Sequence, residues 1–497
     1  MRDHSELAHF AKTIELDQVR ARIAARAASE PGRLLARELA PLEERSLVEA
    51  ALARTREAAL LAEPPDLSGV ASVAEIFDRA RVAKRALDPR ELWLLAMTVR
   101  AGEAARQAPL GPALRALTVP VDPSYAERVA AVIDPETFEV RFELVKDIRE
   151  ARLAARSELA ERLTEIALEH PGASVTERRG RLCLATRSAL AGTLLDREGA
   201  VTFLEPESAR ELANRVLELE LEEAARTDRL LVELDALARA HEPAIRALGA
   251  LLARLDLHLA LGRWARELDL REPVLGDALV LEQVRHPLLA ESALRQAQGE
   301  RCVPIDVRLE ETRLLVITGP NGGGKTVALK TTGLAVLLAL SGSFVPARSA
   351  RVPLAGELLA ASVAADDLAH GLSTFEVHAR RLAAVAQRAE PSSLVLLDEL
   401  GLGTDPIEGG ALARALLEHL LARGARVLAT THLGPLKVFA ATTPGAAVAS
   451  VEVDARGRPL YRLAVGKAGE SSALAVARRA GVPEPIVTRA EAILHGR

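Results

Sequence analysis

The chain has 497 residues, which is too long for one hydrophobic core and predicts about three domains. Hydrophobic residues make up 49% of it, which excludes general disorder, and a net charge of −5 argues against a protein that coats nucleic acid by bulk charge. A local basic patch is still compatible with these numbers, so composition leaves the partner open.

The ends, apolar runs and cysteines bear on the compartment. No apolar run approaches the ~18–20 residues that cross a bilayer, and the charged N-terminus MRDHSELAHF lacks the apolar core of a signal peptide. Cys183 and Cys302 are solitary and far apart in sequence, which argues against a disulfide framework. We therefore expect a cytoplasmic protein without a membrane segment.

Residues 1–140 are predicted to form a helical core, interrupted at Glu63–Pro65, Asp88–Arg90 and Pro120–Pro123. A long amphipathic helix is then predicted over Arg141–Glu169. Its narrow apolar stripe is explained by ordinary helix packing. The stripe consists of Leu144, Ile148, Ala155, Leu159, Leu163 and Ile166.

A small β region is predicted next, so that residues 141–205 form a first lever helix with a clamp-like β tip. The central Arg-Gly of SVTERRGRLCLAT predicts a short hairpin, and GAVTFLEP predicts a further strand. Residues 206–273 are predicted to return as lever and core helices, the first running from Ser208 to about Ala240. Leu230, Leu234 and Leu237 lie on one face of it.

Four guanidinium groups gather on the predicted β tip and suit contact with backbone phosphates of DNA. The alternative is an ordinary solvated charged loop. The four residues are Arg178, Arg179, Arg181 and Arg187.

The period of the sequence changes from about residue 274. The short apolar runs DALVLEQVRHPLL, RLLVIT, SSLVLLDEL and ARVLATTH alternate with helical segments, which predicts a parallel sheet in an α/β domain over 274–465. The last segment, 466–497, predicts two short helices joined at Gly481–Pro483.

The stretch TGPNGGGKT lies between the predicted strand RLLVIT and a predicted helix, the context that a phosphate-binding loop requires. Its glycines let backbone N–H groups turn toward phosphate oxygens, and the helix N-terminus adds partial positive charge. Lys325 is placed to neutralise the β- and γ-phosphates, and Thr326 to offer its hydroxyl to Mg²⁺. The predicted ATP-binding residues are Gly319, Pro320, Asn321, Gly322, Gly323, Gly324, Lys325 and Thr326.

Two carboxylates follow the buried run Leu394–Leu397, at the end of a strand where α/β sheets bind ligands. Asp398 would hold Mg²⁺ through its water shell, and Glu399 would orient or deprotonate the attacking water. His432 ends another predicted strand, where it would sense the γ-phosphate or the water; a purely structural histidine is the alternative.

Ser373 and Thr374, in GLSTFEVHARRL, lie where a helix could begin. Their hydroxyls could cap that helix, or the helix N-terminus could face a phosphate held by another subunit.

The motifs TGPNGGGKT, LSTFEVH, LLDELGLGTDPIEGGALA and TTHLGPLK, in this order, resemble the ATPase domain of the MutS family. Thr326 and the stretches GTDPIEG, GAVTFLEPES and LYRLAVGKAGESSALAVARRAGVP are similar to the second bacterial subtype, MutS-II. The resemblance spans nearly the whole chain and is strongest over about 280–490.

The resemblance implies a dimer with ABC-like composite ATP sites that use ATP and Mg²⁺, in which Ser373 and Thr374 reach the partner's nucleotide. It also implies core and clamp regions for the lever and β tip, and a dimerising helix-turn-helix at the C-terminus. The expected fold is thus α plus α/β and multidomain. A helical core and lever with a small β clamp would precede an ABC-like P-loop ATPase domain.

Some features depart from the family pattern. Phe203-Leu-Glu205 has the spacing of the mismatch-reading wedge but matches the MutS-II clamp motif, so we do not assign it that role. MutS-II proteins usually continue into a Smr nuclease domain; this sequence ends at Arg497, so we expect no nuclease activity from it. Val448 and Ser472 stand where the subtype usually has Asn, and SVAADDLAHG is shorter than its usual acidic loop.

Three functions remain after this comparison. The first is a dimeric ATPase whose arms close around branched or mismatched DNA, acting in DNA repair or the suppression of recombination. The second is an ATPase that binds ribosomal RNA and acts on stalled or collided ribosomes. The third is a regulatory ABC-like ATPase without nucleic acid.

Overall fold

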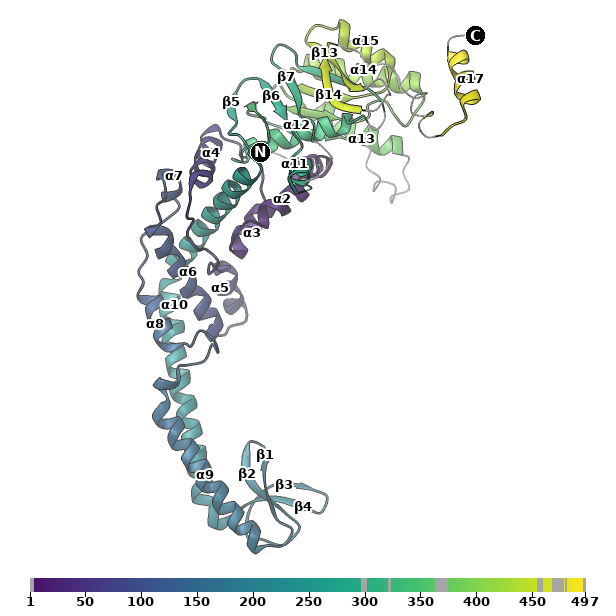
Figure 1. Cartoon of the computed structure of the whole chain (residues 1–497). Coiled ribbons are helices and arrows are strands. Elements are labelled where there is room, and N and C mark those ends of the chain that lie inside the picture. The colour runs from purple at the N-terminus through teal and green to yellow at the C-terminus, as the bar shows by residue number, and fades with distance from the viewer. Residues whose placement is uncertain are drawn as a thin grey trace. The chain divides into compact units, whose positions relative to one another are not determined.

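A computed structural model describes residues 4–295, 302–320, 323–362, 374–453, 459–466, 478 and 481–494 (Figure 1). The chain forms two compact units, and neither is continuous in sequence. The first comprises Met1–Ser68, Arg106–Thr118 and Leu251–Arg497, and the second comprises Gly69–Ala105 and Val119–Ala250. Residues near the N-terminus therefore fold with the second half of the chain.

The first unit is organised by a six-stranded sheet of order β10-β11-β12-β8-β13-β14. Five neighbouring strands are parallel, and β14 is antiparallel to β13. The strands are β8 (Leu314–Thr318), β10 (Leu358–Ala361), β11 (Leu394–Leu397), β12 (Arg426–Thr430), β13 (Ala446–Val453) and β14 (Pro459–Val465). The predicted parallel strands at RLLVIT, SSLVLLDEL and ARVLATTH are confirmed.

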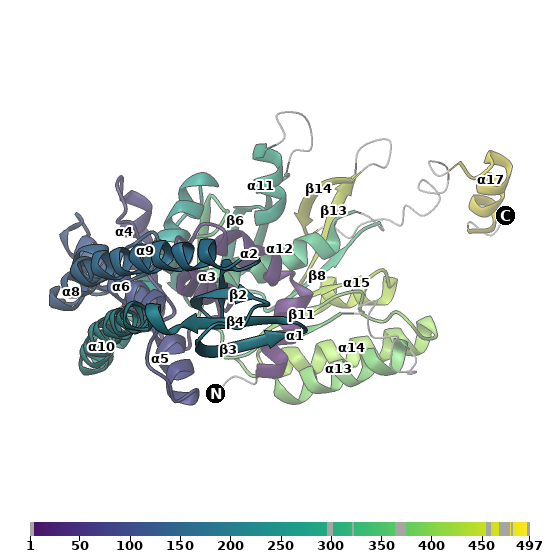
Figure 2. The ribbon, with the colours of Figure 1, turned by 90° about the horizontal axis from the view of Figure 1, so that it is seen from below.

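Helices cover both faces of this sheet, because successive residues of each strand point to opposite sides. In β8, Leu314 and Val316 pack into one hydrophobic cluster, while Leu315 and Ile317 pack into another. Helices α13 (Thr374–Arg388), α14 (Pro406–Ala422) and α15 (Gly434–Thr442) supply the first cluster, and α12 (Lys325–Leu340) supplies the second (Figure 2).

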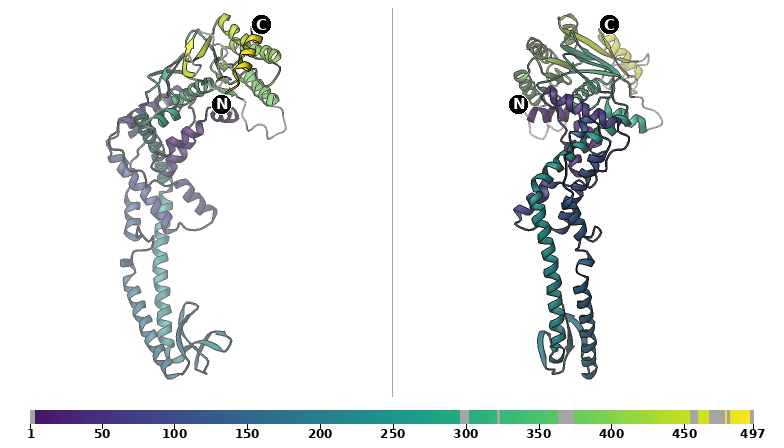
Figure 3. Two further views of the ribbon diagram at one scale, coloured as in Figure 1. Left: turned by 45° about the vertical axis from the view of Figure 1, so that its right-hand side comes forward. Right: turned by 90° about the vertical axis from the view of Figure 1, so that its left-hand side faces the viewer.

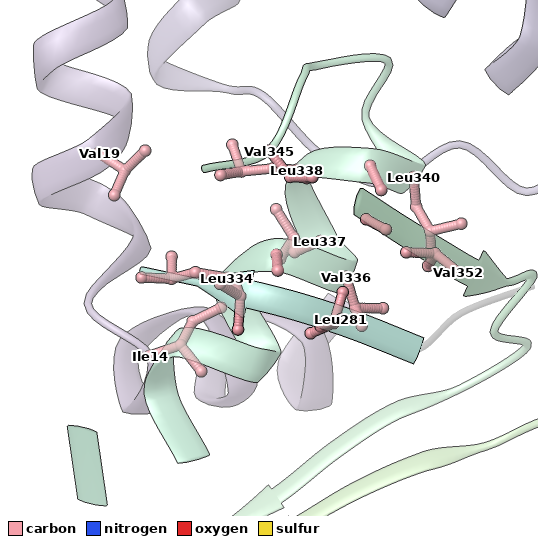
Figure 4. Close-up of a cluster of buried hydrophobic side chains, with 14 of the residues drawn as sticks. Ile14, Val19, Leu281, Leu334, Val336, Leu337, Leu338, Leu340, Val345 and Val352 are labelled. Carbon is pink, nitrogen blue, oxygen red and sulfur yellow. The ribbon is translucent and has the colours of Figure 1, made fainter. Parts of the chain in front are cut away.

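The N-terminal helices pack on α12 and complete the second cluster (Figure 4). A Cβ on Gly333 would lie 2.7 Å from Ile14 Cγ2, so the two segments are in close contact. Lys330 of α12 also pairs with Glu15 at 2.6 Å. The remaining helices of this unit are α1 (His4–Thr13), α2 (Leu16–Ala24), α3 (Glu30–Arg37), α4 (Arg45–Leu60), α7 (Pro112–Arg115), α11 (Pro287–Arg295) and α17 (Glu484–Leu494).

A second sheet of the first unit corrects one prediction. The run DALVLEQVRHPLL was assigned to the parallel sheet, but β6 (Leu279–Val284) pairs antiparallel with β7 (Ile305–Leu309) and with β9 (Ser349–Pro353). The fourth strand, β5 (Val274–Gly276), is parallel to β9. A buried apolar run does not by itself reveal which sheet a strand joins, and this is why the assignment failed.

The second unit contains two long helices that lie side by side, α9 (Lys146–Glu169) and the part of α10 up to Ala250 (Figure 3). Apolar residues of both helices share one cluster, and Glu223 of α10 pairs with Arg149 and Arg152 of α9 at 2.6 and 2.9 Å. The unit also holds α5 (Val73–Val82), α6 (Pro89–Gln107), α8 (Ser124–Val132) and the short 3₁₀ turns η1 (Phe142–Leu144) and η2 (Glu207–Ala209).

The two predicted lever helices differ from the observed ones at their ends. The first begins at Lys146 rather than Arg141, because η1 precedes it, and Leu144 is the one stripe residue that is not buried. The second, α10 (Arg210–Glu267), does not stop near Ala240 but passes through Pro243. Burial of its apolar face beyond that point, at Ile245, Leu248, Leu252, Leu255 and Leu259, outweighs the lost backbone hydrogen bond.

The clamp sheet has the order β1-β2-β4-β3, all antiparallel. The predicted hairpin is confirmed, with Arg179 and Gly180 at positive φ (53° and 76°) in its turn, as is the strand at GAVTFLEP. Strand β3 was not predicted, because it is largely exposed and lacks the apolar alternation of a half-buried strand. The strands are β1 (Ser174–Arg178), β2 (Arg181–Thr186), β3 (Gly192–Glu198) and β4 (Val201–Pro206).

The remaining expectations concern the C-terminus, the thiols and the bilayer. The second of the two predicted C-terminal helices is α17, and the first falls on residues outside those described. Cys183 and Cys302 are both free thiols. Within the ranges given above, no helix has both the length and the apolar character needed to span a bilayer.

A buried histidine joins three parts of the first unit. Thr55 Oγ1 donates to Gly342 O, just beyond the end of α12, at 2.6 Å and lies 3.2 Å from His258 Nδ1 on α10. Because the hydroxyl proton of Thr55 is engaged by Gly342, Nδ1 of His258 is the donor of the second bond. Burial lowers the pKa of His258 to about 3, with Arg54 and Arg254 acting in the same direction.

This burial predicts a pH dependence of stability. His258 is neutral in the folded chain down to about pH 3, while in the unfolded chain it takes up a proton below its ordinary pKa near 6.5. The contribution of His258 to the free energy of unfolding is therefore fully present above pH 6.5 and is lost as the pH falls from there toward 3. The loss is up to ~1.4 kcal/mol per pH unit. His258→Gln should flatten the dependence measured by urea unfolding between pH 6.5 and 4.5. His419→Gln, which removes an exposed histidine of the same unit, is the control, and equal slopes for wild type and His258→Gln would contradict this account.

Candidate functional site

Polar side chains converge where β8, β11 and β12 end. These strands are adjacent and parallel, so their carboxyl ends meet at one edge of the sheet, which we call the carboxyl edge. The loop after β8 brings Lys325 and Thr326, the end of β11 brings Asp398 and Glu399, and the end of β12 brings Thr430.

Lys325 is held by the backbone of its own loop. Its Nζ donates to the carbonyl oxygens of Gly319 and Pro320, each at 3.0 Å, and the residue is 5% exposed. Burial lowers the pKa of this ammonium group, and the nearby charges of Glu399 and Asp398 oppose that shift. Neutral carbonyls leave the buried positive charge only partly compensated, so an anion bound beside it would be stabilised.

The loop backbone adopts conformations that favour glycine. Gly319 and Gly324 have φ of 141° and 98°, and α12 begins directly after Gly324. Gly323 N donates to Pro320 O at 3.1 Å. The predicted ligands Asn321 and Gly322 lie outside the described residues.

Asp398 is the centre of a hydrogen-bond network at the carboxyl edge. Its Oδ1 accepts from Thr430 Oγ1 at 2.6 Å and from Thr326 Oγ1 at 3.2 Å. Thr430, which is fully buried, also accepts from the backbone N–H of Glu399 at 2.7 Å. One hydroxyl therefore links both carboxylate residues to the neighbouring strand. The sequence placed Thr430 at a strand end but gave no signal for this role.

Glu399 has a φ of +51°, a left-handed conformation that is strained for a residue with a side chain. The strain is held by two hydrogen bonds to one residue, from Glu399 N to Thr430 Oγ1 and from Leu400 N to Thr430 O at 2.8 Å. Such local strain is typical of functional sites.

His432 lies near the same edge, two residues after β12. Burial lowers its pKa, the charges of Lys325 and Lys437 act in the same direction, and Asp398 opposes them. Its Nε2 is buried and has no hydrogen-bond partner within the described part of the chain. The imidazole is thus neutral at pH 7 and retains a ring nitrogen that a ligand could use.

The glycine-rich stretch after Glu399 is explained by packing. Gly401 has φ of 89°, and a Cβ on Gly409 would come within 2.7 Å of Gly401 O. Asp405 caps α14 by accepting from the N–H groups of Ile407 and Glu408 at 2.9 and 3.2 Å. The residues GLGTDPIEGG therefore form a tight turn that fixes Glu399 relative to α14.

The four clamp arginines are not equally free. Arg178 and Arg179 pair with Asp196 at 2.8 and 3.6 Å, and Arg181 pairs with Glu205 at 3.0 Å. Arg187 is exposed and forms no ion pair with any residue that the structure describes. Phosphate contact by the first three would have to compete with carboxylates, because each pair neutralises charge locally.

The structure describes only part of the loop that is predicted to face another subunit. Ser373 lies outside the described residues. Thr374 is the first residue of α13, as predicted, but its side chain is not described.

Comparison with known proteins agrees with the motifs. Residues 315–496 match the model of MutS domain V. The chain is 38% identical over 506 residues to a protein named Endonuclease MutS2 from Thermus thermophilus, covering 97% of this chain and 65% of the relative. Endonuclease MutS2 of Thermomicrobium roseum is also 38% identical, over 529 residues, with the same coverage of both chains. The chain thus spans about two thirds of the length of these relatives.

The Thr430 network predicts a specific loss of stability. Thr430→Val keeps the side-chain shape but removes the hydroxyl. The backbone N–H of Glu399 then loses its acceptor, and Asp398 loses one of its donors. We expect a loss of about 1–3 kcal/mol in the free energy of unfolding, measured with urea, and recovery in Thr430→Ser. Thr332→Val is the matched control. The buried hydroxyl of Thr332 donates only to the carbonyl oxygen of Ala328, one turn earlier in the same helix. Equal stability of Thr430→Val and wild type would show that the network contributes nothing.

Proposed function

We propose that this chain, which belongs to the MutS family, is an Mg²⁺-dependent ATPase that couples ATP binding to the binding of DNA. The observation that carries the proposal is the carboxyl edge. Lys325, Thr326, Asp398 and Glu399 meet there, and these residue types suit phosphoryl transfer.

In the proposed reaction, Lys325 exchanges the carbonyls of Gly319 and Pro320 for the β- and γ-phosphates of ATP. The exchange is favourable because anionic oxygens compensate the buried ammonium group better than neutral carbonyls do. The N-terminus of α12 adds its partial positive charge at the same place.

The oxygens of Thr326 and Asp398 suit Mg²⁺. They are 3.2 Å apart, and hard oxygen donors of this kind are those that Mg²⁺ prefers, with the remaining positions taken by water and phosphate. Mg²⁺ would supply neutralisation of the charge on the phosphates. In the metal-bound state, Thr430 would continue to orient Asp398 through its hydrogen bond to Oδ1.

We assign Glu399 to the attacking water, which its carboxylate would orient or deprotonate. Its position is fixed by the left-handed backbone and by Thr430, so little reorganisation would be needed. We assign His432 to contact with the γ-phosphate or with the same water, because the charges of Lys325 and Asp398 act on its ring and its Nε2 is not used by any described residue.

We further propose that the protein acts as a homodimer in which Ser373 and Thr374 of one chain contact the nucleotide of the other. One ground is the resemblance of GLSTFEVH to the partner-facing loop of the family. The other is that Thr374 is the first residue of α13, so the N–H groups at the start of that helix would be available to a phosphate. The C-terminal helices, of which α17 is one, would contribute to the dimer contact.

The preferred partner is branched or mismatched DNA, held by the lever and the clamp. The support comes from the relatives, which are named as endonucleases. For this chain we propose ATP hydrolysis as the activity, because the residues at the carboxyl edge suit that reaction. Ribosome binding is the alternative, and an ABC-like regulatory role without nucleic acid is a second alternative.

Two substitutions separate the steps at the ATP site. Lys325→Ala should weaken ATP binding at least 10-fold, because the countercharge to the phosphates is removed. Glu399→Gln should retain binding within about 3-fold but lower kcat by 10²-fold or more, because the water step needs the carboxylate. Binding is measured with a fluorescent ATP analogue and turnover by phosphate release. Normal turnover of Glu399→Gln would remove Glu399 from its role.

The clamp arginines test the choice of partner. Replacing all four with Ala should weaken binding to a branched DNA and make the dependence of log K on log salt concentration less steep. Arg187→Ala alone should reduce that slope by about one. Arg229→Ala, which removes an exposed arginine from α10 of the same unit, is the control. An unchanged slope in the fourfold variant would exclude the clamp tip, and co-sedimentation with ribosomes without DNA binding would favour the alternative partner.

A further inference from the structure

Helix α13 is directly connected to the carboxyl edge. It carries the chain from the end of β10 back to the start of β11, and these strands are parallel neighbours, so the first turns of α13 lie at the edge where both strands end. Ala361 at the end of β10 accepts a hydrogen bond from Asp398 N at 2.9 Å, and α13 packs against β10. Asp398 is therefore hydrogen-bonded to the strand against which α13 packs.

His378 lies in this part of α13 and is an unusual buried group. It is 3% exposed, and neither Nδ1 nor Nε2 has a hydrogen-bond partner among the residues that the structure describes. Burial lowers its pKa, Arg381 acts in the same direction, and the negative charge of Asp398 opposes them. A neutral imidazole has one donor and one acceptor, so both are left unused at a position that excludes water.

Asp398 retains the complementary capacity. Both side-chain hydrogen bonds described at its carboxylate, from Thr326 and Thr430, go to Oδ1. A carboxylate has about four acceptor positions over its two oxygens, so Oδ2 can serve a metal and another donor together. An unsatisfied donor thus lies on the helix that packs against β10, the strand bonded to Asp398, and the charge of Asp398 acts on that donor's ring.

We propose that His378 is a positioning residue for ATP hydrolysis, whose ring N–H donates to the Asp398 carboxylate when ATP and Mg²⁺ are bound. The inference rests on the proposed function of the carboxyl edge. The hydrogen bond would fix the orientation of Asp398 toward the metal and fasten the start of α13 to the loaded site. Outer partners of metal-binding carboxylates act in this way in other proteins.

The test replaces the ring with an apolar side chain and with a polar one. His378→Leu should leave the unfolding temperature of the nucleotide-free protein unchanged or raise it, because the imidazole makes no hydrogen bond there. The same variant should lower kcat about 10- to 100-fold and raise the Mg²⁺ concentration for half-maximal activity, with the Kd for ATP changed less than about 3-fold. His378→Gln retains a donor and should recover most of both losses.

Trp264→Phe is the matched control, because the indole Nε1 of Trp264 on α10 is also buried and has no partner in the described ranges. The smaller ring leaves a cavity and should lower the unfolding temperature, but kcat and the Mg²⁺ requirement should keep their wild-type values. The variant therefore reports whether removal of a buried unpaired donor elsewhere in this unit changes turnover.

Three results would overturn the inference. In the first, His378→Leu has the kcat and the Mg²⁺ requirement of the wild type. In the second, His378→Leu is markedly destabilised or unfolded without nucleotide. In the third, His378→Gln is folded but as inactive as His378→Leu. If the wild type does not hydrolyse ATP, the proposed function fails first, and the two failures are thereby distinguished.

Discussion

The hydroxyl of Thr430 determines how the carboxyl edge is built. It donates to Asp398 on the neighbouring strand and accepts from the N–H of Glu399, so two adjacent carboxylate residues are placed by one buried group. The parallel register of β11 and β12, which pairs Leu397 with Ala429, brings these strand ends level. Lys325, held by carbonyls across the edge, provides the opposite charge. The pairing of buried polar groups thus orders the site before any ligand is bound.

The sequence was sufficient for features with a local signal. The strand and helix around TGPNGGGKT, the strand before Asp398 and the clamp hairpin follow from apolar runs, glycines and turn residues, and they are present. Features set by distant contacts could not be predicted. The role of Thr430, the unpartnered state of His378 and the pairing of Arg181 with Glu205 each depend on segments that meet only in the folded chain. The return helix, predicted to end near Ala240, continues through Pro243 because tertiary packing outweighs the local signal.

The N-terminal helices form part of the unit that contains the carboxyl edge. Helix α12 is buried on nearly all sides, and its packing partners include Ile14 and the Glu15–Lys330 pair. Beyond its other end, Gly342 is bonded to Thr55, which in turn contacts His258 of α10. Short, buried contacts thus connect the helix that follows the phosphate loop with the N-terminal helices and with α10.

The central claim is that the carboxyl edge holds Mg²⁺ and ATP. An experimental structure of the Glu399→Gln protein with both bound tests it most directly. The account predicts that Lys325 Nζ leaves the carbonyls of Gly319 and Pro320 for the β- and γ-phosphates. It also predicts that Mg²⁺ lies between the hydroxyl of Thr326 and the carboxylate of Asp398, and that Ser373 of the partner subunit contacts the γ-phosphate. Nucleotide bound elsewhere, with Lys325 still on both carbonyls, would contradict it.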